Sequence, residues 1–505
     1  MANLYETLSR RFPADLSRPF AWLPDGRCMT YADVETASAR FANVLADADV
    51  EPGDRVAVQA AKSIEMLMLY LGCLRAGAVF LPLNPAYTAG ELSYFLRDAE
   101  PALFVCDPAR EAEALELAQA QGGIRVETLG EHGDGTLNEL VASASPVFAT
   151  VAREDDDLAA ILYTSGTTGR SKGAMLSHGN LASNALTLVD YWRFTGEDVL
   201  LHALPIFHTH GLFVGTNVTL AAGASMIFQP KFDAGMVMAA LPRATVMMGV
   251  PTFYIRLLAE PGFDRDLISH MRLFISGSAP LSADIHREFF ERTGHAILER
   301  YGMTETNMNT SNPYEGERRA GTVGFPLPGV SIRIADPETG AALPSGEIGV
   351  IEIAGPNVFK GYWRMPEKTA EEFRDGFFIS GDLGFIDERG YVSIVGRAKD
   401  LIIAGGYNIY PAEVEAALDE LPQVHESAVI GAPHPDLGEG VVAIVVPRDP
   451  TFADGETLVT ALADRLARYK QPRRIFILPE LPKNSMGKVQ KTVLRDRFRY
   501  TFAQS

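Results

Sequence analysis

Strand-like and helix-like segments alternate between residues 54 and 106, and this alternation constrains the fold more than any other feature of the sequence. Short apolar runs alternate with segments whose apolar residues recur at helical spacing. The expected strands are Arg55–Gln59, Val79–Leu83 and Leu103–Cys106, and the expected helices are Ser63–Arg75 and Gly90–Asp98. This strand–helix–strand–helix–strand order predicts a parallel, doubly wound α/β sheet.

The alternation returns in the middle of the chain and then changes. Further strands are expected at 199–204, 225–228, 245–249, 273–276 and 296–299. The region from about 325 to 395 is rich in Gly and Pro and predicts a small β subdomain. Beyond it, a helix from Pro411, strands at 428–430 and 441–446 and a helix at 458–469 predict a small α+β domain. We expect an α/β fold with a large N-terminal domain (1–397), which includes the β subdomain, and a small C-terminal domain (398–505).

The composition is that of a globular, acidic protein. A chain of 505 residues with 47% hydrophobic residues is long for one core and predicts several domains. The formal net charge is −19 and no block of Lys and Arg stands out, so we expect neither a nucleic-acid nor a membrane partner. The three cysteines lack metal-ligand spacing, and no signal sequence or membrane-spanning run is evident, which favours the cytoplasm.

A ten-residue segment after the strand-like run 158–163 is typical of a phosphate-binding loop. The sequence Thr164-Ser-Gly-Thr-Thr-Gly-Arg-Ser-Lys-Gly173 contains three glycines and several hydroxyl residues. Glycines let backbone amides approach an anion, hydroxyls donate to phosphate oxygens, and Lys172 adds a positive charge. The nucleoside-triphosphatase loop requires Ser or Thr after its lysine and then a helix, whereas Gly173 and a strand-like run follow Lys172.

Together with four further motifs, this loop resembles the acyl-adenylate-forming superfamily, which includes acyl-CoA synthetases, luciferases and peptide-synthetase adenylation domains. The other motifs are Tyr301-Gly-Met-Thr-Glu305, Ser380-Gly-Asp382, Gly396-Arg-Ala-Lys-Asp-Leu-Ile402 and Pro482-Lys-Asn-Ser-Met-Gly-Lys488. The resemblance implies an ATP-dependent acid–thiol ligase. Such an enzyme forms an acyl-adenylate, passes the acyl group to coenzyme A, and rotates a small, mobile C-terminal domain between the two half-reactions.

The resemblance also implies which residues act in the first half-reaction, in which two anions must be joined. Cations at the α-phosphate and at the attacking carboxylate lower that barrier. Lys488 is the expected catalytic cation, and Lys172 is expected to support the phosphates. Glu305, preceded by Thr304, is the expected Mg²⁺ ligand, because an ion that bridges ATP phosphates takes one or two protein oxygens. Lys488 is also expected as a possible target of regulatory acetylation, which would remove its charge.

The remaining nucleotide and thiol contacts follow from the same resemblance. Asp382 is expected to bind the ribose hydroxyls, with Arg397 as a second ribose or phosphate contact. Lys399 is the expected hinge. Gly405 and Gly406 are expected to line the coenzyme A channel, although a tight turn explains two adjacent glycines nearly as well. The expected ATP-binding residues are Thr164, Ser165, Gly166, Thr167, Thr168, Gly169, Lys172, Gly277, Ser278, Ala279, Tyr301, Asp382 and Arg397.

Arg300 carries the prediction about the acid. Relatives that bind apolar acids tend to have Gln-Gly before the Tyr-Gly-Met-Thr-Glu motif, whereas this chain has Glu299-Arg300. A buried, unpaired guanidinium is costly, so we expect an anionic partner, and a second carboxylate on the substrate is the natural one. Arg256 lies where the family lines the acyl site, so two arginines could clamp that carboxylate. The alternative is a salt bridge to a protein acid such as Glu299.

Three further residues are expected beside the acid. His208, in Phe207-His-Thr-His-Gly211, resembles the family's aromatic residue at the substrate mouth, and a histidine pair without a third ligand does not predict a metal. Thr209 and Met308 are expected to touch the α-carbon. The segment 299–311 is most similar to malonyl-CoA synthetases, which implies malonate, with methylmalonate as a second acid, and ATP, Mg²⁺ and coenzyme A as cofactors. Acetate and propionate should react poorly, because a site built to pair a charge rejects analogues without it.

Three alternatives remain open on the sequence alone. The first is a ligase for another small acid, with Arg300 held in a protein salt bridge. The second is an adenylation enzyme that loads a carrier protein, although such enzymes usually place an Asp beside the substrate amine. The third is a nucleotide-sensing protein without catalysis, and the joint presence of Glu305, Lys172 and Lys488 argues against it.

Overall fold

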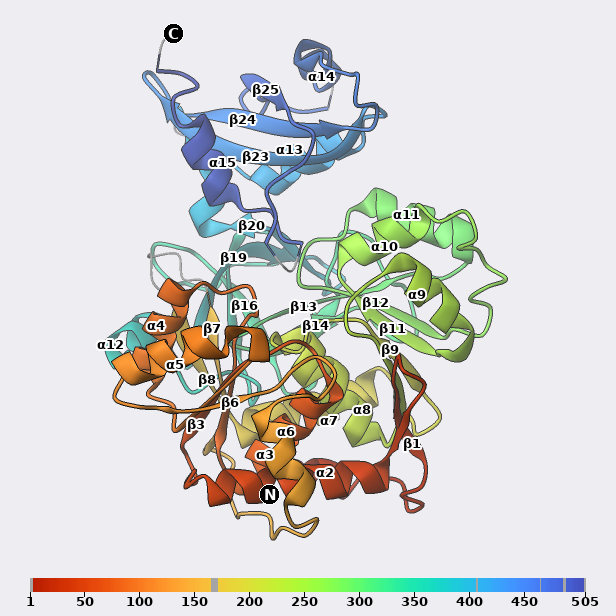
Figure 1. The fold of residues 1–505 in the computed structure, drawn as a ribbon. Helices are drawn as coiled ribbons and strands as arrows, with labels where there is room; N and C mark the ends of the chain where they lie inside the picture. Colours follow the sequence, from red (N-terminus) through yellow and green to blue (C-terminus); the bar gives the residue numbers. More distant parts are fainter. Residues whose placement is uncertain (1–2, 165–170, 406, 464, 485–486, 504–505) are drawn as a thin grey trace.

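The computed structural model describes residues 3–164, 171–405, 407–463, 465–484 and 487–503, and the strands of these residues form four sheets. Two large α/β sheets make up most of the chain, and two smaller sheets follow them. In Figure 1 the C-terminal part, coloured blue, lies at one end of the molecule, beyond the red-to-green part that carries the large sheets. The predicted α/β class with a small C-terminal domain is confirmed.

The first large sheet has the strand order β6-β5-β3-β4-β7-β8. All its pairs are parallel except β7 with β8, which form an antiparallel hairpin around the predicted phosphate loop. Its strands are β3 (Arg55–Gln59), β4 (Val79–Pro82), β5 (Leu103–Cys106), β6 (Arg125–Thr128), β7 (Leu158–Thr164) and β8 (Lys172–Ser177). Its helices are α2 (Tyr31–Asp47), α3 (Ile64–Ala76), α4 (Ala89–Ala99), η1 (Pro108–Arg110), α5 (Glu111–Ala120) and α6 (Thr136–Ser143).

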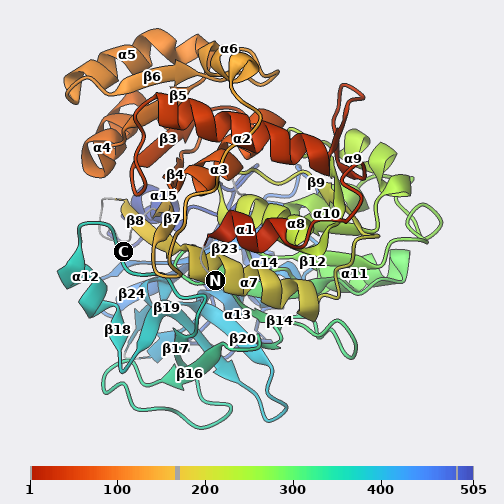
Figure 2. The ribbon, with the colours of Figure 1, turned by 90° about the horizontal axis from the view of Figure 1, so that it is seen from below.

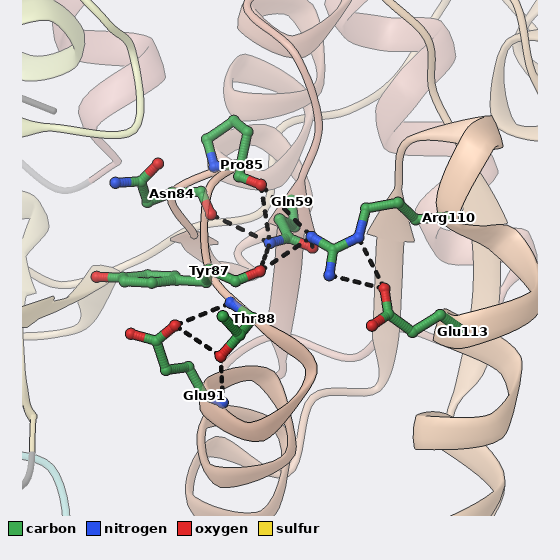
Figure 3. Close-up of polar contacts among 8 residues, drawn as sticks. All are labelled: Gln59, Asn84, Pro85, Tyr87, Thr88, Glu91, Arg110 and Glu113. Atoms are coloured by element: carbon green, nitrogen blue, oxygen red, sulfur yellow. Dashed lines mark hydrogen bonds and ion pairs between the residues drawn. The ribbon is translucent and has the colours of Figure 1, made fainter.

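The chain leaves β3 toward β4 and leaves β5 toward β6, so the two connections part at the carboxyl ends of β3 and β5. Ligands often bind in such a crevice. Here the chain's own side chains fill it: Arg110 donates to Gln59 Oε1 at 2.8 Å, and Gln59 donates to the carbonyl oxygens of Asn84 and Tyr87 (Figure 3). The rest of the Arg110 guanidinium pairs with Glu113. These hydrogen bonds hold the loop after β4 in place. The candidate site lies in another part of the molecule.

The second large sheet has the order β15-β14-β13-β12-β11-β9-β10-β1-β2. Its centre is parallel, and β14, β15 and β2 pair antiparallel at the two ends. Its strands are β1 (Pro19–Trp22), β2 (Cys28–Thr30), β9 (Val199–His202), β10 (Ser225–Phe228), β11 (Val246–Gly249), β12 (Leu273–Ser276), β13 (Leu298–Met303), β14 (Asn307–Ser311) and β15 (Phe325–Pro326). Its helices are α1 (Leu4–Ser9), α7 (His178–Tyr191), the π-helix η2 (His210–Thr216), α8 (Asn217–Ala222), α9 (Ala234–Ala240), η3 (Leu241–Arg243), α10 (Pro251–Leu258) and α11 (Ala283–Thr293).

Helix α1 connects the two large sheets. It packs against α3 of the first sheet and against α7 and α8 of the second, as the view from below shows (Figure 2). The backbone N–H of Leu4 donates to His178 Nδ1 at 2.9 Å, which ties the start of α1 to the start of α7. One continuous hydrophobic core then runs through both sheets.

The two smaller sheets follow. The β subdomain contains β16 (Ser331–Ala335), β17 (Gly349–Ala354), α12 (Pro366–Glu371), β18 (Phe373–Arg374), β19 (Phe377–Ile386) and β20 (Val392–Arg397). After η4 (Ala398–Asp400), the C-terminal part contains β21 (Ile402–Ala404), β22 (Tyr407–Ile409), α13 (Pro411–Asp419), β23 (Val424–His434), β24 (Gly438–Pro447), α14 (Gly455–Ala461), β25 (Arg474–Ile477) and α15 (Lys491–Phe498). Two hydrophobic clusters here contain only residues from Ile402 onward, which supports 1–397 and 398–505 as the proposed domains.

Two sequence predictions need correction. The helix expected at 458–469 is α14, which ends at Ala461. Leu462 and Leu466 lie beyond the helix but stay buried in the same core, and single i→i−4 hydrogen bonds link Leu462 to Leu458 and Leu466 to Leu462 without extending the regular helix. The strand expected at 296–299 is β13, which begins at Leu298, because α11 ends with Gly294 in a left-handed conformation and the chain needs the next residues to reach the sheet. No helix of the described residues is both long and apolar enough to cross a membrane.

Candidate active site

The candidate site lies at the carboxyl ends of β12 and β13, the edge at which parallel sheets bind ligands. Gly277 and Ser278 follow β12 directly, with half-buried Ala279 beside them, and β13 carries Arg300 and Tyr301. Ser278 has a φ of 71°, an uncommon conformation for a residue with a side chain and one that clusters at functional sites. Four of the predicted ATP-binding residues and the predicted acid-binding Arg300 are therefore neighbours at one sheet edge.

Arg300 is a buried cation with unsatisfied donors. It is 3% exposed, and its Nε and Nη2 atoms have no hydrogen-bond partner among the described residues. Burial lowers the pKa of Arg300 to about 9. Gly277 makes room for the guanidinium, because a Cβ at that position would lie 2.4 Å from Arg300 Cζ. The site therefore holds a positive charge that the rest of the described chain leaves unpaired.

Glu299 does not neutralise this charge. Neighbouring residues on a strand point to opposite faces, and Glu299 Oε1 accepts a hydrogen bond from the backbone N–H of Leu281 at 3.1 Å. Burial raises the pKa of Glu299 to about 8. Within the described residues, Arg300 forms no ion pair with a carboxylate. The alternative of a salt bridge between Glu299 and Arg300 is therefore not supported.

Two histidines of the segment after β9 face Arg300. Burial and the nearby guanidinium lower the pKa of His208 to about 4 and that of His210 well below its ordinary value, so both rings are neutral at pH 7. His210 Nδ1 lies 3.3 Å from Ser278 Oγ, and its Nε2 is buried without a described partner. His210 was not predicted as a site residue, although it lies in the same segment as His208, Phe207-His-Thr-His-Gly211.

Thr209 and Met308 are both buried at this edge. Each is 2% exposed, and Thr209 Oγ1 has no described hydrogen-bond partner. The Met308 side chain lies against Gly302, where a Cβ would approach Met308 Cε to 2.4 Å. Their expected contact with the α-carbon of the acid stays a prediction.

The structure does not assemble the two-arginine clamp. Arg256 is exposed on α10, with its guanidinium carbon 5.9 Å from the centre of the Phe232 ring. It lies one helical turn after Thr252, and so on the same face of α10. None of the contacts described for Arg256 joins it to Arg300. Its role at the acid therefore stays a prediction.

Asp382, Tyr301 and Arg397 form a polar cluster beside the acid site. The Tyr301 hydroxyl donates to Asp382 Oδ2 at 2.5 Å, and Arg397 Nε lies 3.1 Å from Asp382 Oδ1. β19 and β20 place these residues, because Asp382 pairs directly with Arg397 across the two strands. Three residues that the sequence assigned separately to the nucleotide are thus in mutual contact.

Lys488 reaches this cluster from the C-terminal part. Lys488 is exposed as a whole residue, but desolvation at its ammonium group and the Arg397 charge lower the pKa of Lys488 to about 8, and Asp382 acts in the opposite direction. Two hydrogen bonds join Asn484 and Lys488. The backbone N–H of Asn484 donates to the Lys488 carbonyl oxygen, and the backbone N–H of Lys488 donates to Asn484 Oδ1. Gly487 has a φ of 74°, and a Cβ there would lie 3.2 Å from Thr252 Oγ1 on α10. Lys488 therefore lies close enough to Asp382 and Arg397 to feel their charges, although it follows Asp382 by 106 positions in the sequence.

Glu305 and Lys172 are joined through Tyr362. Glu305 is 7% exposed, and the Tyr362 hydroxyl donates to its Oε1 at 3.1 Å. Lys172 lies over the Tyr362 ring and pairs with Glu372 Oε1 at 3.3 Å. Burial raises the pKa of Glu305, while the Tyr362 hydrogen bond and Lys172 oppose that shift. Thr304, next to Glu305, is half-buried.

The residues around Glu305 fit a magnesium ion that is held mainly by phosphates. Among the described residues, no group of three or more His, Cys, Asp and Glu side chains is arranged to hold a metal by itself. Mg²⁺ that bridges ATP phosphates keeps several waters and takes one or two carboxylates. One buried carboxylate beside a phosphate-loop lysine matches that requirement.

Several predicted residues lie outside the described residues or gain no further contact. Ser165, Gly166, Thr167, Thr168, Gly169 and Gly406 lie outside the described residues. Thr164 ends β7, and its hydroxyl donates to the backbone oxygen of Lys172 at 3.4 Å. Lys399 is exposed in η4, and Gly405 has a φ of 59°. The hinge and channel roles of Lys399 and Gly405 stay predictions.

The family model of AMP-binding enzymes matches residues 10–363, and the model of the AMP-binding enzyme C-terminal domain matches residues 413–488. The chain therefore belongs to the AMP-binding enzyme family. It is 58% identical to MatB from Rhodopseudomonas palustris, solved with ATP bound, with a TM-score of 0.97 over 99% of this chain and 100% of that one. It is also 39% identical to a feruloyl-CoA synthase from Amycolatopsis sp (94% of both chains) and 32% identical to the malonate–CoA ligase of Arabidopsis thaliana (93% of this chain and 85% of the relative).

Proposed function

We propose that the chain activates malonate with ATP and transfers the malonyl group to coenzyme A, with release of AMP and pyrophosphate. The segment 299–311 resembles malonyl-CoA synthetases, the similarity to MatB covers nearly the whole chain, and the malonate–CoA ligase of Arabidopsis thaliana is a more distant relative. Other relatives of the chain are named for feruloyl and indoleacetate substrates. The residues of the acid pocket must therefore support the choice of acid.

Arg300 is the observation that carries this choice. Its guanidinium is buried, positively charged at neutral pH and without a carboxylate partner in the described chain. A carboxylate accepts two parallel hydrogen bonds from a guanidinium, so the distal carboxylate of malonate would satisfy the two unpaired donors. Neutral His210, with its free Nε2, would offer a further donor without adding charge. A monocarboxylic acid would leave Arg300 unpaired.

In the first half-reaction one carboxylate oxygen of malonate attacks the α-phosphorus of ATP. The bond from that phosphorus to the bridging oxygen breaks, and pyrophosphate leaves with the electron pair. Lys488 reduces the repulsion between the carboxylate and the α-phosphate, and Asp382 accepts from the ribose hydroxyls. Bound Mg²⁺ would neutralise phosphate charge, with Glu305 as its protein ligand.

In the second half-reaction the coenzyme A sulfur, after loss of its proton, attacks the malonyl carbon and AMP leaves. We assign Lys399 to the hinge of the C-terminal domain and Gly405 and Gly406 to the thiol channel. Methylmalonate is the proposed second acid, with Thr209 and Met308 beside its methyl group. Regulatory acetylation of Lys488 and a cytoplasmic location belong to the same proposal.

The test is pyrophosphate exchange into ATP with a panel of malonate, methylmalonate, succinate, acetate and benzoate. We expect malonate to give the highest kcat/KM and acetate to be at least 10³-fold poorer, since a site that pairs a charge rejects acids without it by about 10⁴-fold. Acetate that exchanges as fast as malonate would contradict the choice of a dicarboxylate. A parallel assay of coenzyme A against a phosphopantetheinyl carrier protein identifies the thiol acceptor.

A further inference from the structure

Tyr362 touches both residues that the proposed function places at the ATP phosphates. It lies between β17 and α12, is 3% exposed, and is assigned to none of the five motifs. Its hydroxyl donates to Glu305 Oε1 at 3.1 Å. The face of its ring supports Lys172, whose Nζ lies 4.0 Å from the ring centre. One side chain thus contacts a carboxylate with its hydroxyl and a cation with its ring.

The surroundings hold Tyr362 in this orientation. Its backbone N–H donates to Thr369 Oγ1 at 2.9 Å, and its ring packs against Phe359 with ring centres 4.9 Å apart. Glu372 also holds Lys172 in place, because its carboxylate pairs with Lys172 at 3.3 Å and with Lys368 at 3.1 Å. A fixed ring and a fixed hydroxyl give Lys172 and Glu305 defined positions before any nucleotide binds.

We propose that Tyr362 is a positioning residue for the ATP polyphosphate, with two separable functions. Its hydroxyl sets the direction in which Glu305 presents its carboxylate to Mg²⁺, and its ring holds Lys172 toward the phosphates. The inference rests on the proposed function only for the use of ATP and Mg²⁺, and is independent of which acid is activated. It predicts that the two functions can be removed one at a time.

The experiment measures ATP binding by calorimetry on the full-length chain without any acid, once in EDTA and once with saturating Mg²⁺. Tyr362→Phe keeps the ring and loses the hydroxyl. We expect its Kd for ATP in EDTA to stay within about twofold of wild type and its Kd with Mg²⁺ to rise about tenfold, the usual worth of a hydrogen bond to a charged group. Tyr362→Leu loses the ring as well, so its Kd should rise in both conditions.

Tyr391→Phe is the matched control. Tyr391 is also 3% exposed, and its hydroxyl donates to the backbone oxygen of Glu317 at 2.8 Å, with no described contact to Glu305 or Lys172. This variant should bind ATP like wild type in both conditions. Electron paramagnetic resonance of Mn²⁺ with a non-hydrolysable ATP analogue provides a second readout, in which Tyr362→Phe should hold Mn²⁺ about tenfold more weakly.

Two outcomes would overturn the inference. One is Tyr362→Phe with wild-type affinity for ATP in both conditions, and the other is an equal loss with and without metal, which is the mark of a general structural defect. If wild type binds ATP and Mg²⁺ as expected but malonate supports no exchange, the proposed acid fails and the role of Tyr362 stands. The two proposals therefore fail on different measurements.

Discussion

Replacement of Arg300 by Met should abolish malonate activation and at the same time stabilise the fold. The pKa of about 9 shows that burial disfavours the charged guanidinium. A fall of this size for an arginine corresponds to a cost of roughly 4–5 kcal/mol at neutral pH. Replacement of buried charges by apolar groups is often neutral or stabilising by about 1–4 kcal/mol. We therefore expect Arg300→Met to melt a few degrees above wild type in calorimetry.

The same substitution removes the proposed partner of the distal carboxylate. Loss of one member of a buried ion pair costs about 3–5 kcal/mol, so malonate-dependent pyrophosphate exchange should fall by roughly 10²- to 10³-fold in kcat/KM. ATP binding in the absence of acid should not change. Arg300→Gly should lose malonate exchange in the same way.

Arg318→Met serves as the control for the loss of an arginine near β13. Arg318 donates to the backbone oxygens of Ala296, Pro313 and Tyr314, so its loss should lower the melting temperature and leave the preference among acids unchanged. The reasoning is refuted if Arg300→Met keeps malonate exchange within threefold of wild type. It is also refuted if the variant melts well below wild type, since the buried charge would then be a net stabiliser.

Further predictions concern pH, Gly277 and Asp382. The charge of Lys488 is lost as the pH rises through about 8, so kcat/KM for adenylation should fall above pH 8. A flat profile to pH 9.5 would contradict the role of Lys488. Lys488→Gln, which mimics acetylation, should abolish exchange at every pH. Gly277→Ala should raise the KM for malonate at least tenfold, because a Cβ would lie 2.4 Å from Arg300 Cζ, and should have no further effect in Arg300→Met. Asp382→Ala should raise the KM for ATP by about tenfold through lost hydrogen bonds to ribose, and an unchanged KM would exclude that contact.

The fold could be predicted wherever local pattern and tertiary packing agree. The boundaries of β3 and β5 match the prediction to the residue, because both strands are short apolar runs buried in a parallel sheet. The helix expected at 458–469 was too long, because Leu458, Leu462 and Leu466 pack into one core although only the first of them is helical. Apolar spacing indicates which residues are buried, whereas the regular helix ends at Ala461 and only single i→i−4 hydrogen bonds join the later leucines.

The site divides in a similar way. Arg300 could be found because a large charged residue stands next to a recognised motif, and the structure places it in a buried position. Tyr362 and Glu372 could not be found, because their partners are far away in the sequence: Tyr362 and Glu305 are 57 positions apart, and Lys172 and Glu372 are 200 apart. Contacts of that range depend on how the β subdomain packs against the phosphate-loop hairpin. No local pattern contains that information.

The contact between Gly277 and Arg300 sets an order for evolutionary change at this site. A side chain at position 277 would meet the guanidinium at 2.4 Å, so the flexible Arg300 side chain would have to leave its present position to make room. A variant that loses Arg300 first can carry a side chain at position 277 without that movement. Because the first step should stabilise the fold, it needs no compensating mutation elsewhere. A change of acid from this ancestor is thus limited by the selection for malonate and not by the tolerance of the fold.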